Sequence, residues 1–127
     1  SYFIVVNAAN KDKDYAWMKA HQFGNAAFED ISDKVAQLAL QGPKALEVLR
    51  KLVKEEDIPQ NYYTCKFHCV IGSIPCMISK TGYTAEDVVE IYCASADAPA
   101  VRDMLMDAGQ EEGLIPCGPG SRDTLRL

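Results

Sequence analysis

One carboxylate stands out among the side chains that could do chemistry. Glu90 lies in the run VVEIY, whose other residues are apolar or aromatic. A carboxylate among apolar neighbours needs a partner, because a buried and unpaired charge is very costly. An ionised carboxylate only accepts hydrogen bonds, so it matches a ligand that presents two parallel N–H donors. Two interpretations follow: either the Glu90 face of a strand is exposed to solvent, or Glu90 receives such a ligand.

Three further side chains are candidates for the same kind of binding site. Tyr83 follows Gly82 in the sequence, and a tyrosine there can lay its ring against a planar ligand or orient one with its hydroxyl. Arg122 follows a Gly-Pro-Gly-Ser turn at the start of a predicted helix. Asn7 lies within an apolar run, where a buried amide must find hydrogen-bond partners. Each also has a structural interpretation: loop packing for Tyr83, an ion pair for Arg122 and a satisfied amide for Asn7.

The histidines and the glycine-rich segment do not indicate other kinds of site. Neither His21 nor His68 has a Ser, Cys or carboxylate at a spacing that is diagnostic of a nucleophilic triad or a metal site. The segment CGPGSRD lacks the Lys-Ser/Thr pair of a phosphate-binding P-loop and follows no convincing strand. We therefore expect no metal, and phosphate binding is weakly supported.

The cysteine pattern indicates free thiols. The five cysteines, an odd number without a CxxC pair, fit neither a disulfide scaffold nor a zinc site. Cys65 and Cys69 lie in one predicted strand about 13 Å apart, beyond the reach of roughly 7 Å that a disulfide allows. We expect free buried thiols in a reducing intracellular compartment. The choice between a bacterial cytoplasm and a mitochondrial matrix stays open.

The composition is that of a globular domain. The chain has 127 residues, which is the length of one domain, and its 13 basic and 18 acidic residues give a net charge of −5. This acidic balance argues against nucleic acid or an anionic membrane as a partner, since phosphate binding needs clustered Lys and Arg. No apolar run approaches the roughly 18 residues that span a bilayer.

The hydrophobic spacing predicts strands and helices that alternate along the chain. Strands are expected at Tyr2–Ala8, Val35–Leu40, in a hairpin within Tyr63–Lys80, and at Val88–Cys93. Helices are expected after Asn10, from Pro43 through Val53, from Ala98, and at the C-terminal end. This order favours an α+β fold over residues 1–127, with a mostly antiparallel sheet, helices on one face and a split βαβ (ferredoxin-like) character.

Four segments in a fixed order carry a more specific resemblance. They are VVNAANKDKDYAWM, ALQGPKALEVL, SKTGYTAEDVVEIY and PCGPGSRDTLRL, and together they run from near residue 2 to the last residue. The chain resembles the aminomethyltransferase family, the T proteins of the glycine cleavage system. The TGYT-x-ED-x-x-E stretch and the RD-x-LRL ending are the most specific parts.

The resemblance implies a function in one-carbon metabolism. Members of the family move an aminomethyl group from the lipoyl arm of the H protein onto tetrahydrofolate, their acceptor substrate. The products are 5,10-methylenetetrahydrofolate, ammonia and the dihydrolipoyl protein. The implied partners are therefore the lipoylated H protein and folate, and the implied fold has three domains around a central folate site.

The same resemblance implies a role for each candidate side chain. Glu90 resembles the glutamate that grips the 2-amino and N3–H edge of the pterin ring. Tyr83 resembles the tyrosine that lines this ring, and Arg122 the arginine that closes the other side of the site. Asn7 and Val5 resemble the strand segment that touches the folate.

Two departures from the family pattern bear on these expectations. Ala85 and Val88 stand where the family usually has glycine, and Val88 in particular, which removes a close backbone approach or a bend, puts the strand geometry before Glu90 in question. The catalytic aspartate of the family lies upstream of the VVNA strand, and its C-terminal domain lies beyond RDTLRL. We therefore expect a central fragment with part of the folate site and no activity of its own, and its catalytic residue is unknown because the family aspartate lies upstream.

Two alternatives remain open. One is the folate-binding half of a sarcosine or dimethylglycine dehydrogenase, which shares these motifs but receives its one-carbon unit from a flavin domain. The other is a non-catalytic module that binds a small metabolite or a protein partner, because an α+β scaffold hosts many functions. Flavin bound to the full-length gene product would indicate the dehydrogenase. Equal folate affinities of the chain and of Glu90→Gln would favour the non-catalytic module.

Overall fold

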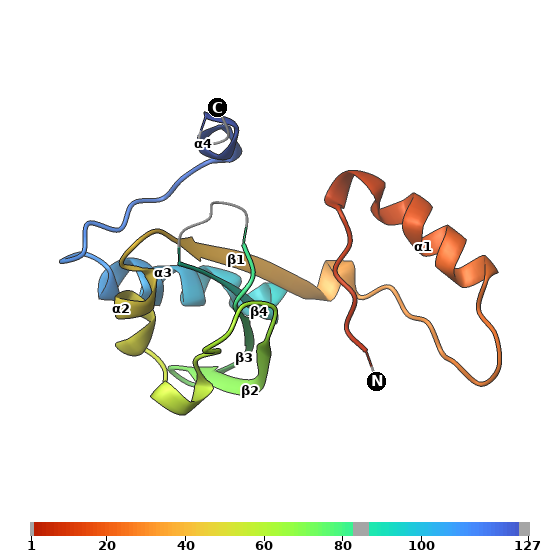
Figure 1. Cartoon of the computed structure of the whole chain (residues 1–127), viewed down its shortest axis with the longest axis horizontal. Coiled ribbons are helices and arrows are strands. Elements are labelled where there is room, and N and C mark those ends of the chain that lie inside the picture. The colour runs from red at the N-terminus through yellow and green to blue at the C-terminus, as the bar shows by residue number, and fades with distance from the viewer. Residues whose placement is uncertain (1, 83–86, 125–127) are drawn as a thin grey trace. The chain divides into compact units, whose positions relative to one another are not determined.

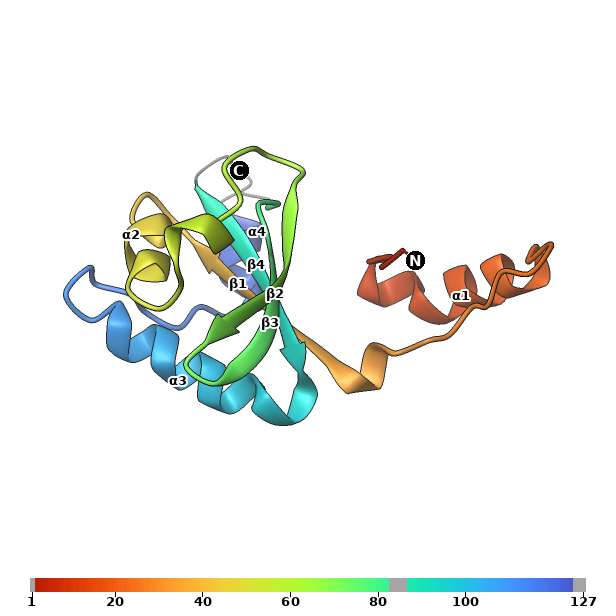
Figure 2. The ribbon, with the colours of Figure 1, turned by 90° about the horizontal axis from the view of Figure 1, so that it is seen from below.

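The structure is a computed structural model that describes residues 2–82 and 87–124, with Arg122 described by its backbone alone. Its contacts divide the chain into two compact units, residues 1–32 and 33–127. Figure 1 shows the helices and strands of both units, and Figure 2 shows the same ribbon from below. The larger unit contains the sheet and Glu90.

The first unit has no strand within its described residues. The prediction of a buried strand at Tyr2–Ala8 is wrong: the segment is irregular and ends in a 3-10 turn at Ala8–Asn10. Tyr2 is 97% exposed and Ile4 54% exposed. A strand needs a neighbouring strand for its backbone groups and an apolar surface for its side chains. Residues 2–32 offer neither, since none of them is buried.

Helix α1 (Lys11–Ala20) begins where the sequence predicts. Asn10 occupies the N-cap position without a side-chain capping bond, and acidic Asp12 and Asp14 in the first turn suit the positive end of the helix dipole. The helix ends at Ala20, before the predicted end at Gly24, which has a φ of +62°. The Tyr15 and Phe28 rings, 6.0 Å apart, hold the returning chain near the helix.

The second unit is an α+β fold built on one antiparallel sheet, as predicted. Its strands are β1 (Val35–Gln41), β2 (Cys65–Ile71), β3 (Ile74–Ser79) and β4 (Val88–Ala94), in the order β1-β4-β3-β2. Its helices are α2 (Ala45–Arg50), α3 (Ala98–Ala108) and α4 (Pro119–Thr124), with 3-10 turns at Ser32–Lys34, Glu55–Asp57 and Ser95–Asp97. The order places β4 inside the sheet, where both of its edges are paired.

The β2–β3 hairpin forms as predicted, but its side chains do not alternate as the sequence suggests. The register between the strands shifts between Lys66 and Cys69, and His68 adopts a φ of +64°. This bulge leaves Phe67 exposed while Cys69 is buried, although simple alternation places both on one face. Pro75 pairs with Val70 and lies beyond the stretch where β3 pairs with β4, so its missing N–H costs no ladder bond there.

Helix α2 is shorter than predicted. The sequence places Pro43 at its first position, but the helix begins at Ala45 and Lys44 is its N-cap. It ends at Arg50, and the chain then turns so that Val53 still reaches the core. The spacing of apolar residues therefore predicts the buried face correctly and the helix ends incorrectly.

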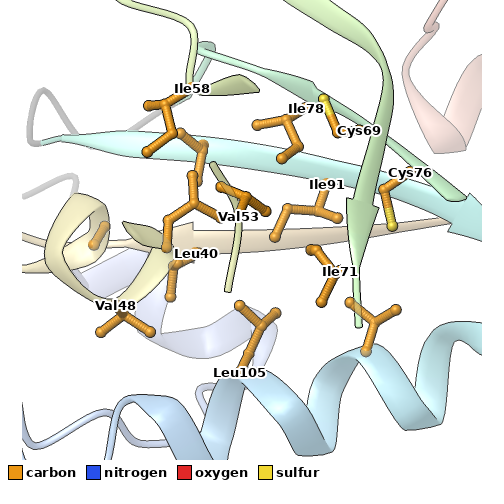
Figure 3. Packing of buried hydrophobic residues seen from close by; sticks show 14 of the residues in the cluster. Leu40, Val48, Val53, Ile58, Cys69, Ile71, Cys76, Ile78, Ile91 and Leu105 are labelled. Atoms are coloured by element: carbon orange, nitrogen blue, oxygen red, sulfur yellow. The ribbon is translucent and has the colours of Figure 1, made fainter. Parts of the chain in front are cut away.

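Helices α2 and α3 cover one face of the sheet, and the core lies between these helices and the sheet. Figure 3 shows Leu105 of α3 directed toward Ile71 and Ile91 of the strands, and Val48 of α2 belongs to the same cluster. The buried face of α3 includes Val101 and Leu105, as its spacing predicts. Burial of such side chains is worth roughly 1.5–3 kcal/mol each, which makes this layer the main source of stability.

All five cysteines are free, as predicted. Cys69, Cys76 and Cys93 are buried, and Cys69 lies opposite Cys76 in the β2–β3 ladder. Burial raises the pKa of the Cys76 thiol to about 11. Cys65 and Cys117 are exposed, so the expectation that the thiols are buried is wrong for these two. The three buried cysteines therefore act as small core residues.

Candidate ligand-binding site around Glu90

Strand β4 places Glu90 in the middle of the sheet. Ala39 of β1 lies opposite it on one side and Ser79 of β3 on the other. Glu90 is only 6% exposed, so the interpretation that it lies on a solvated face is wrong. The carboxylate is held inside the second unit, where its hydrogen-bonding needs must be met by side chains.

Both faces of β4 are buried, and Glu90 lies on the face opposite the helices. Val89 and Ile91 point into the core, while Val88, Glu90 and Tyr92 alternate with them. Tyr92 is 7% exposed. Gln37, which lies opposite Tyr92 in β1, is exposed, as is Ala39. The buried carboxylate therefore lies close to surface residues of the same sheet face.

Three side chains donate hydrogen bonds to the Glu90 carboxylate. The Gln37 amide nitrogen Nε2 lies 2.6 Å from Oε1. The other oxygen, Oε2, accepts from the Thr81 hydroxyl and from the Tyr92 hydroxyl, the latter at 3.1 Å. These donors replace the hydrogen bonds to water that a carboxylate gives up when it is buried.

The Ser79 and Thr81 hydroxyls form a chain with a fixed direction. Their oxygens are 2.7 Å apart, and either atom could donate by geometry alone. Thr81 has one hydroxyl hydrogen, and the ionised carboxylate of Glu90 can only accept, so Thr81 donates to Glu90. Ser79 must then donate to Thr81. Two hydroxyl dipoles in series therefore point at the carboxylate.

The partners of Glu90 within the described residues are neutral, with no ion pair to the carboxylate. The nearest cation in sequence, Lys80, is engaged elsewhere. Its Nζ lies 3.5 Å from the Asp87 carboxylate, 3.3 Å from the Gln60 carbonyl oxygen and 5.2 Å from the centre of the Tyr62 ring. The negative charge of Glu90 is therefore not neutralised by a described side chain and suits a ligand edge of N–H donors.

Val88 does not disturb the strand that carries Glu90. Strand β4 pairs with β1 in one unbroken register from Gln41–Val88 to Val35–Ala94. The Val88 side chain is buried and fills the space beside Gly82, where a Cβ atom would lie 2.4 Å from it. The valine therefore takes up room that a residue with a side chain at position 82 would need. The pairing of β4 is regular from Val88 onward, while Ala85 lies outside the described residues.

The remaining predicted site residues are not brought together by the structure. Tyr83 lies outside the described residues, and Arg122 is in α4 with its side chain outside them. Asn7 and Val5 belong to the first unit and are exposed, so the expectation that the Asn7 amide is buried is wrong. Without the predicted strand around it, nothing in residues 2–32 covers this side chain. A role for these four residues in binding stays a prediction.

Sequence reasoning missed the residues that hold the Glu90 carboxylate. Alternation places Tyr92 on the same face, and Thr81 opens the TGYT motif, so both carry a signal. Ser79 of β3 lies directly opposite Glu90 of β4. Gln37 lies 53 residues away, and its only signal is a polar side chain inside the apolar run VAQLAL.

The described residues lack a metal cluster and a membrane-spanning helix. Residues 2–82 and 87–124 contain no group of three or more His, Cys, Asp or Glu side chains that could hold a metal ion. In the same part of the chain, none of the helices has the length and apolar character needed to cross a bilayer. The candidate site is built on the Glu90 carboxylate with its hydroxyl and amide donors.

Comparison with known proteins agrees with the motifs. Residues 1–127 match the family described as the GCVT N-terminal domain. The chain is 47% identical over 126 residues to proteins named aminomethyltransferase from Bacillus mycoides (strain KBAB4) and Bacillus cereus (strain AH187). A third, from Bacillus cereus (strain G9842), is 46% identical over 126 residues. Each match covers 99% of this chain and 34% of the relative, so the chain spans about a third of their length.

The match over the whole chain confirms the resemblance that its four motifs carry. The chain belongs to the GCVT N-terminal domain family, the aminomethyltransferase family.

Proposed function

We propose that this chain forms part of the folate site of a glycine cleavage aminomethyltransferase. The reaction transfers the aminomethyl group from the lipoyl arm of the H protein to tetrahydrofolate, and yields 5,10-methylenetetrahydrofolate and ammonia. The observation that carries the proposal is Glu90, a carboxylate 6% exposed in the motif TGYT-x-ED-x-x-E and held by neutral donors. The family match and the name of the relatives support it.

In this proposal the Glu90 carboxylate binds the edge of the pterin ring. The 2-amino group and N3–H of a pterin are two parallel donors, and the two oxygens of one carboxylate accept such a pair. Because Glu90 is only 6% exposed, an analogue that lacks one of these N–H groups leaves an oxygen without its donor, and binding weakens strongly. Glu90 thus contributes orientation and discrimination.

The other site residues keep the roles that the family resemblance implies. Tyr83 would line the pterin ring and Arg122 would close the opposite side of the site. Asn7 and Val5 would touch the folate from the N-terminal segment. All four are proposals that rest on the motifs.

The chemistry would depend mainly on placement. N5 of the folate attacks the aminomethyl carbon while the lipoyl thiol leaves, and a fixed near-attack geometry supplies several kcal/mol toward the barrier. The chain spans 34% of its relatives, so the whole reaction, the H protein as partner and the release of ammonia belong to the longer protein in this proposal. We expect the chain alone to bind folate without turnover.

Titration calorimetry with 5-formyltetrahydrofolate, a stable reduced folate, tests the binding role. In Glu90→Gln one oxygen becomes an NH₂ group that faces a ligand donor, and the lost charge-assisted bond should weaken binding about 10- to 100-fold. Glu47→Gln, on the exposed face of α2, is the matched control and should bind like the parent. Equal affinities of the parent and Glu90→Gln contradict the proposal.

A separate assay tests the expected lack of turnover. The chain is mixed with H protein that carries the aminomethyl group and with tetrahydrofolate, and the ammonia released is measured. We expect no release above that of a mixture without the chain. Release by the chain alone would show that the fragment is active and would contradict this part of the proposal.

A further inference from the structure

The Gln37 amide has a hydrogen that Glu90 does not use. Its nitrogen Nε2 carries two hydrogens, and it lies 2.6 Å from Oε1 of Glu90. An ionised carboxylate only accepts, so the NH₂ group of Gln37 faces it rather than the amide oxygen. Gln37 is exposed and lies opposite Tyr92, on the sheet face that holds Glu90. One N–H of Gln37 therefore binds Oε1, and the other is directed to the open side of this face.

The other side of the carboxylate offers acceptors. The Thr81 and Tyr92 hydroxyls both donate to Oε2 of Glu90. Each hydroxyl has a single hydrogen, so both hydrogens are used in these bonds and the hydroxyl oxygens present lone pairs only. Read across the carboxylate, the site therefore presents a donor at Gln37, an acceptor at Oε1 and acceptors around Oε2.

A pterin ring has a complementary edge. Its 4-oxo oxygen, N3–H and 2-amino group follow one another as acceptor, donor and donor. A ligand donor on Oε1 lies beside the Gln37 amide, because both donors follow the lone-pair directions of the same oxygen. In the reversed alignment the 4-oxo oxygen would face the Thr81 and Tyr92 oxygens, whose hydrogens are used, and this acceptor would stay unpaired. One alignment therefore matches every group on the edge.

We propose that Gln37 donates its second N–H to the 4-oxo oxygen of the pterin, while N3–H binds Oε1 of Glu90 and the 2-amino group faces Oε2. This inference rests on the proposed function, because it takes a pterin as the ligand. Gln37 then has two tasks. It holds the Glu90 carboxylate, and it determines which way the edge of the ring lies.

Calorimetry with two probes tests the contact with the 4-oxo oxygen. The first probe is 5-formyltetrahydrofolate, and the second is its 4-thioxo analogue, which keeps N3–H and the 2-amino group but has a sulfur atom, a poor acceptor, in place of the oxygen. We expect the parent to bind the analogue about fivefold more weakly, the equivalent of one ordinary hydrogen bond. Gln37→Met should bind the two probes within twofold of each other.

The ratio of the two affinities separates direct contact from support of Glu90. Gln37→Met also removes a donor from Oε1, and this loss affects both probes alike. Methionine is unbranched and about as long as glutamine, so the larger size of sulfur acts on the parent and the variant in the same way. Gln110→Met, at an exposed glutamine that follows α3, is the matched control and should keep the ratio of the parent.

Two results would overturn the inference alone. If Glu90→Gln binds 5-formyltetrahydrofolate weakly and Gln37→Met keeps the fivefold ratio, the 4-oxo oxygen is bound elsewhere. If Gln37→Met instead loses the parent's preference over an analogue with a methyl group in place of the 2-amino group, the edge lies reversed. If the parent binds neither probe, or Glu90→Gln binds the first probe as tightly as the parent, the proposed function fails and the inference fails with it.

A second measurement observes the Gln37 amide in the parent chain. In ¹⁵N-labelled protein, the two side-chain N–H protons of Gln37 are assigned by their absence from the spectrum of Gln37→Met. Saturation with 5-formyltetrahydrofolate should move one of them downfield, as a new hydrogen bond to a carbonyl oxygen does, and the 4-thioxo analogue should move it much less. Equal shifts with both probes, or no shift with either, would overturn the inference.

Discussion

Replacement of Glu90 by glutamine and by leucine should destabilise the second unit by different amounts. Glutamine keeps an oxygen for Thr81 and Tyr92, the two donors on Oε2, and turns its NH₂ toward Gln37. The exposed Gln37 amide can then rotate to present its own oxygen. Glu90→Gln therefore keeps all three hydrogen bonds and loses only their charge assistance.

The difference follows from the hydrogen bonds of the carboxylate. Bonds to a charged group contribute about 1.5–3 kcal/mol and neutral ones about 0.5–1.5 kcal/mol. Each bond therefore loses roughly 1 kcal/mol in Glu90→Gln, and the smaller penalty for burying a neutral amide offsets part of the sum, so the free energy of unfolding should fall by about 2 kcal/mol. Leucine accepts no hydrogen bond and leaves Thr81 and Tyr92 without this acceptor. Because the apolar side chain is also easier to bury than a charge, part of this larger loss is offset, and we expect Glu90→Leu to lose about 3–4 kcal/mol, a large part of the total stability of a small domain.

Urea unfolding followed by circular dichroism measures both losses, and the slope of the transition shows whether the folded state is unchanged. Glu47→Gln, an exposed acid on α2, should change the free energy of unfolding by less than about 0.5 kcal/mol. The reasoning is refuted if Glu90→Leu is as stable as the parent or more stable than Glu90→Gln. In that case Thr81 and Tyr92 would not need the Glu90 carboxylate as their hydrogen-bond acceptor.

Three further predictions concern the rest of the second unit. Leu49→Ala removes a side chain with 0% exposure and should lower the free energy of unfolding, measured in urea, by about 2–5 kcal/mol. Leu46 is half-buried, so Leu46→Ala should cost clearly less, and equal losses would contradict the assignment of the core. Gly82→Ala places a Cβ 2.4 Å from both the Cβ and a Cγ of Val88, so it should lower the melting temperature of the parent more than that of Val88→Gly, which lacks both atoms; equal losses in the two backgrounds would disprove this contact. Burial raises the pKa of Cys76 to about 11 from an ordinary value of 9.0, so above pH 9 the thiol ionises in the unfolded chain before it ionises in the folded one. The free energy of unfolding should therefore fall by up to about 1.4 kcal/mol per pH unit between pH 9 and 11, and Cys76→Ala should reduce this slope.

The elements of the second unit were predictable because each is encoded locally. The run VVEIY is short and, apart from Glu90, apolar or aromatic, which is typical of a strand buried on both faces. The stripe of Val101 and Leu105 has helical spacing, so β4 and α3 both follow from the local sequence. The Phe67–His68 bulge was not predictable in this way. It depends on a positive φ at His68 and on the register of two strands, which alternation alone does not contain.

The N-terminal segment shows the opposite case. Tyr2–Ala8 has the composition of a buried strand, yet within residues 2–32 it has no strand to pair with and no core to cover it. Composition gives the tendency to form a strand, but the strand itself depends on partners elsewhere. The same holds for Asn7, whose expected burial depended on that strand.

For the candidate site, the sequence identified the carboxylate but not the side chains that hold it. Glu90 is recognisable because a charge in an apolar run is unusual. Its donors come from three strands or their ends: Gln37 from β1, Thr81 after β3 and Tyr92 from β4. The order β1-β4-β3-β2 brings them together, and this order is not encoded in any one segment.

A cycle of four affinities tests whether the Glu90 oxygens receive the paired donors of a pterin. The parent and Glu90→Gln are each titrated with 5-formyltetrahydrofolate and with an analogue that carries a methyl group in place of the 2-amino group. We expect the parent to bind the analogue about tenfold or more weakly, and Glu90→Gln to show a far smaller difference. If both proteins discriminate equally, the 2-amino group is recognised elsewhere and Glu90 does not receive the pair.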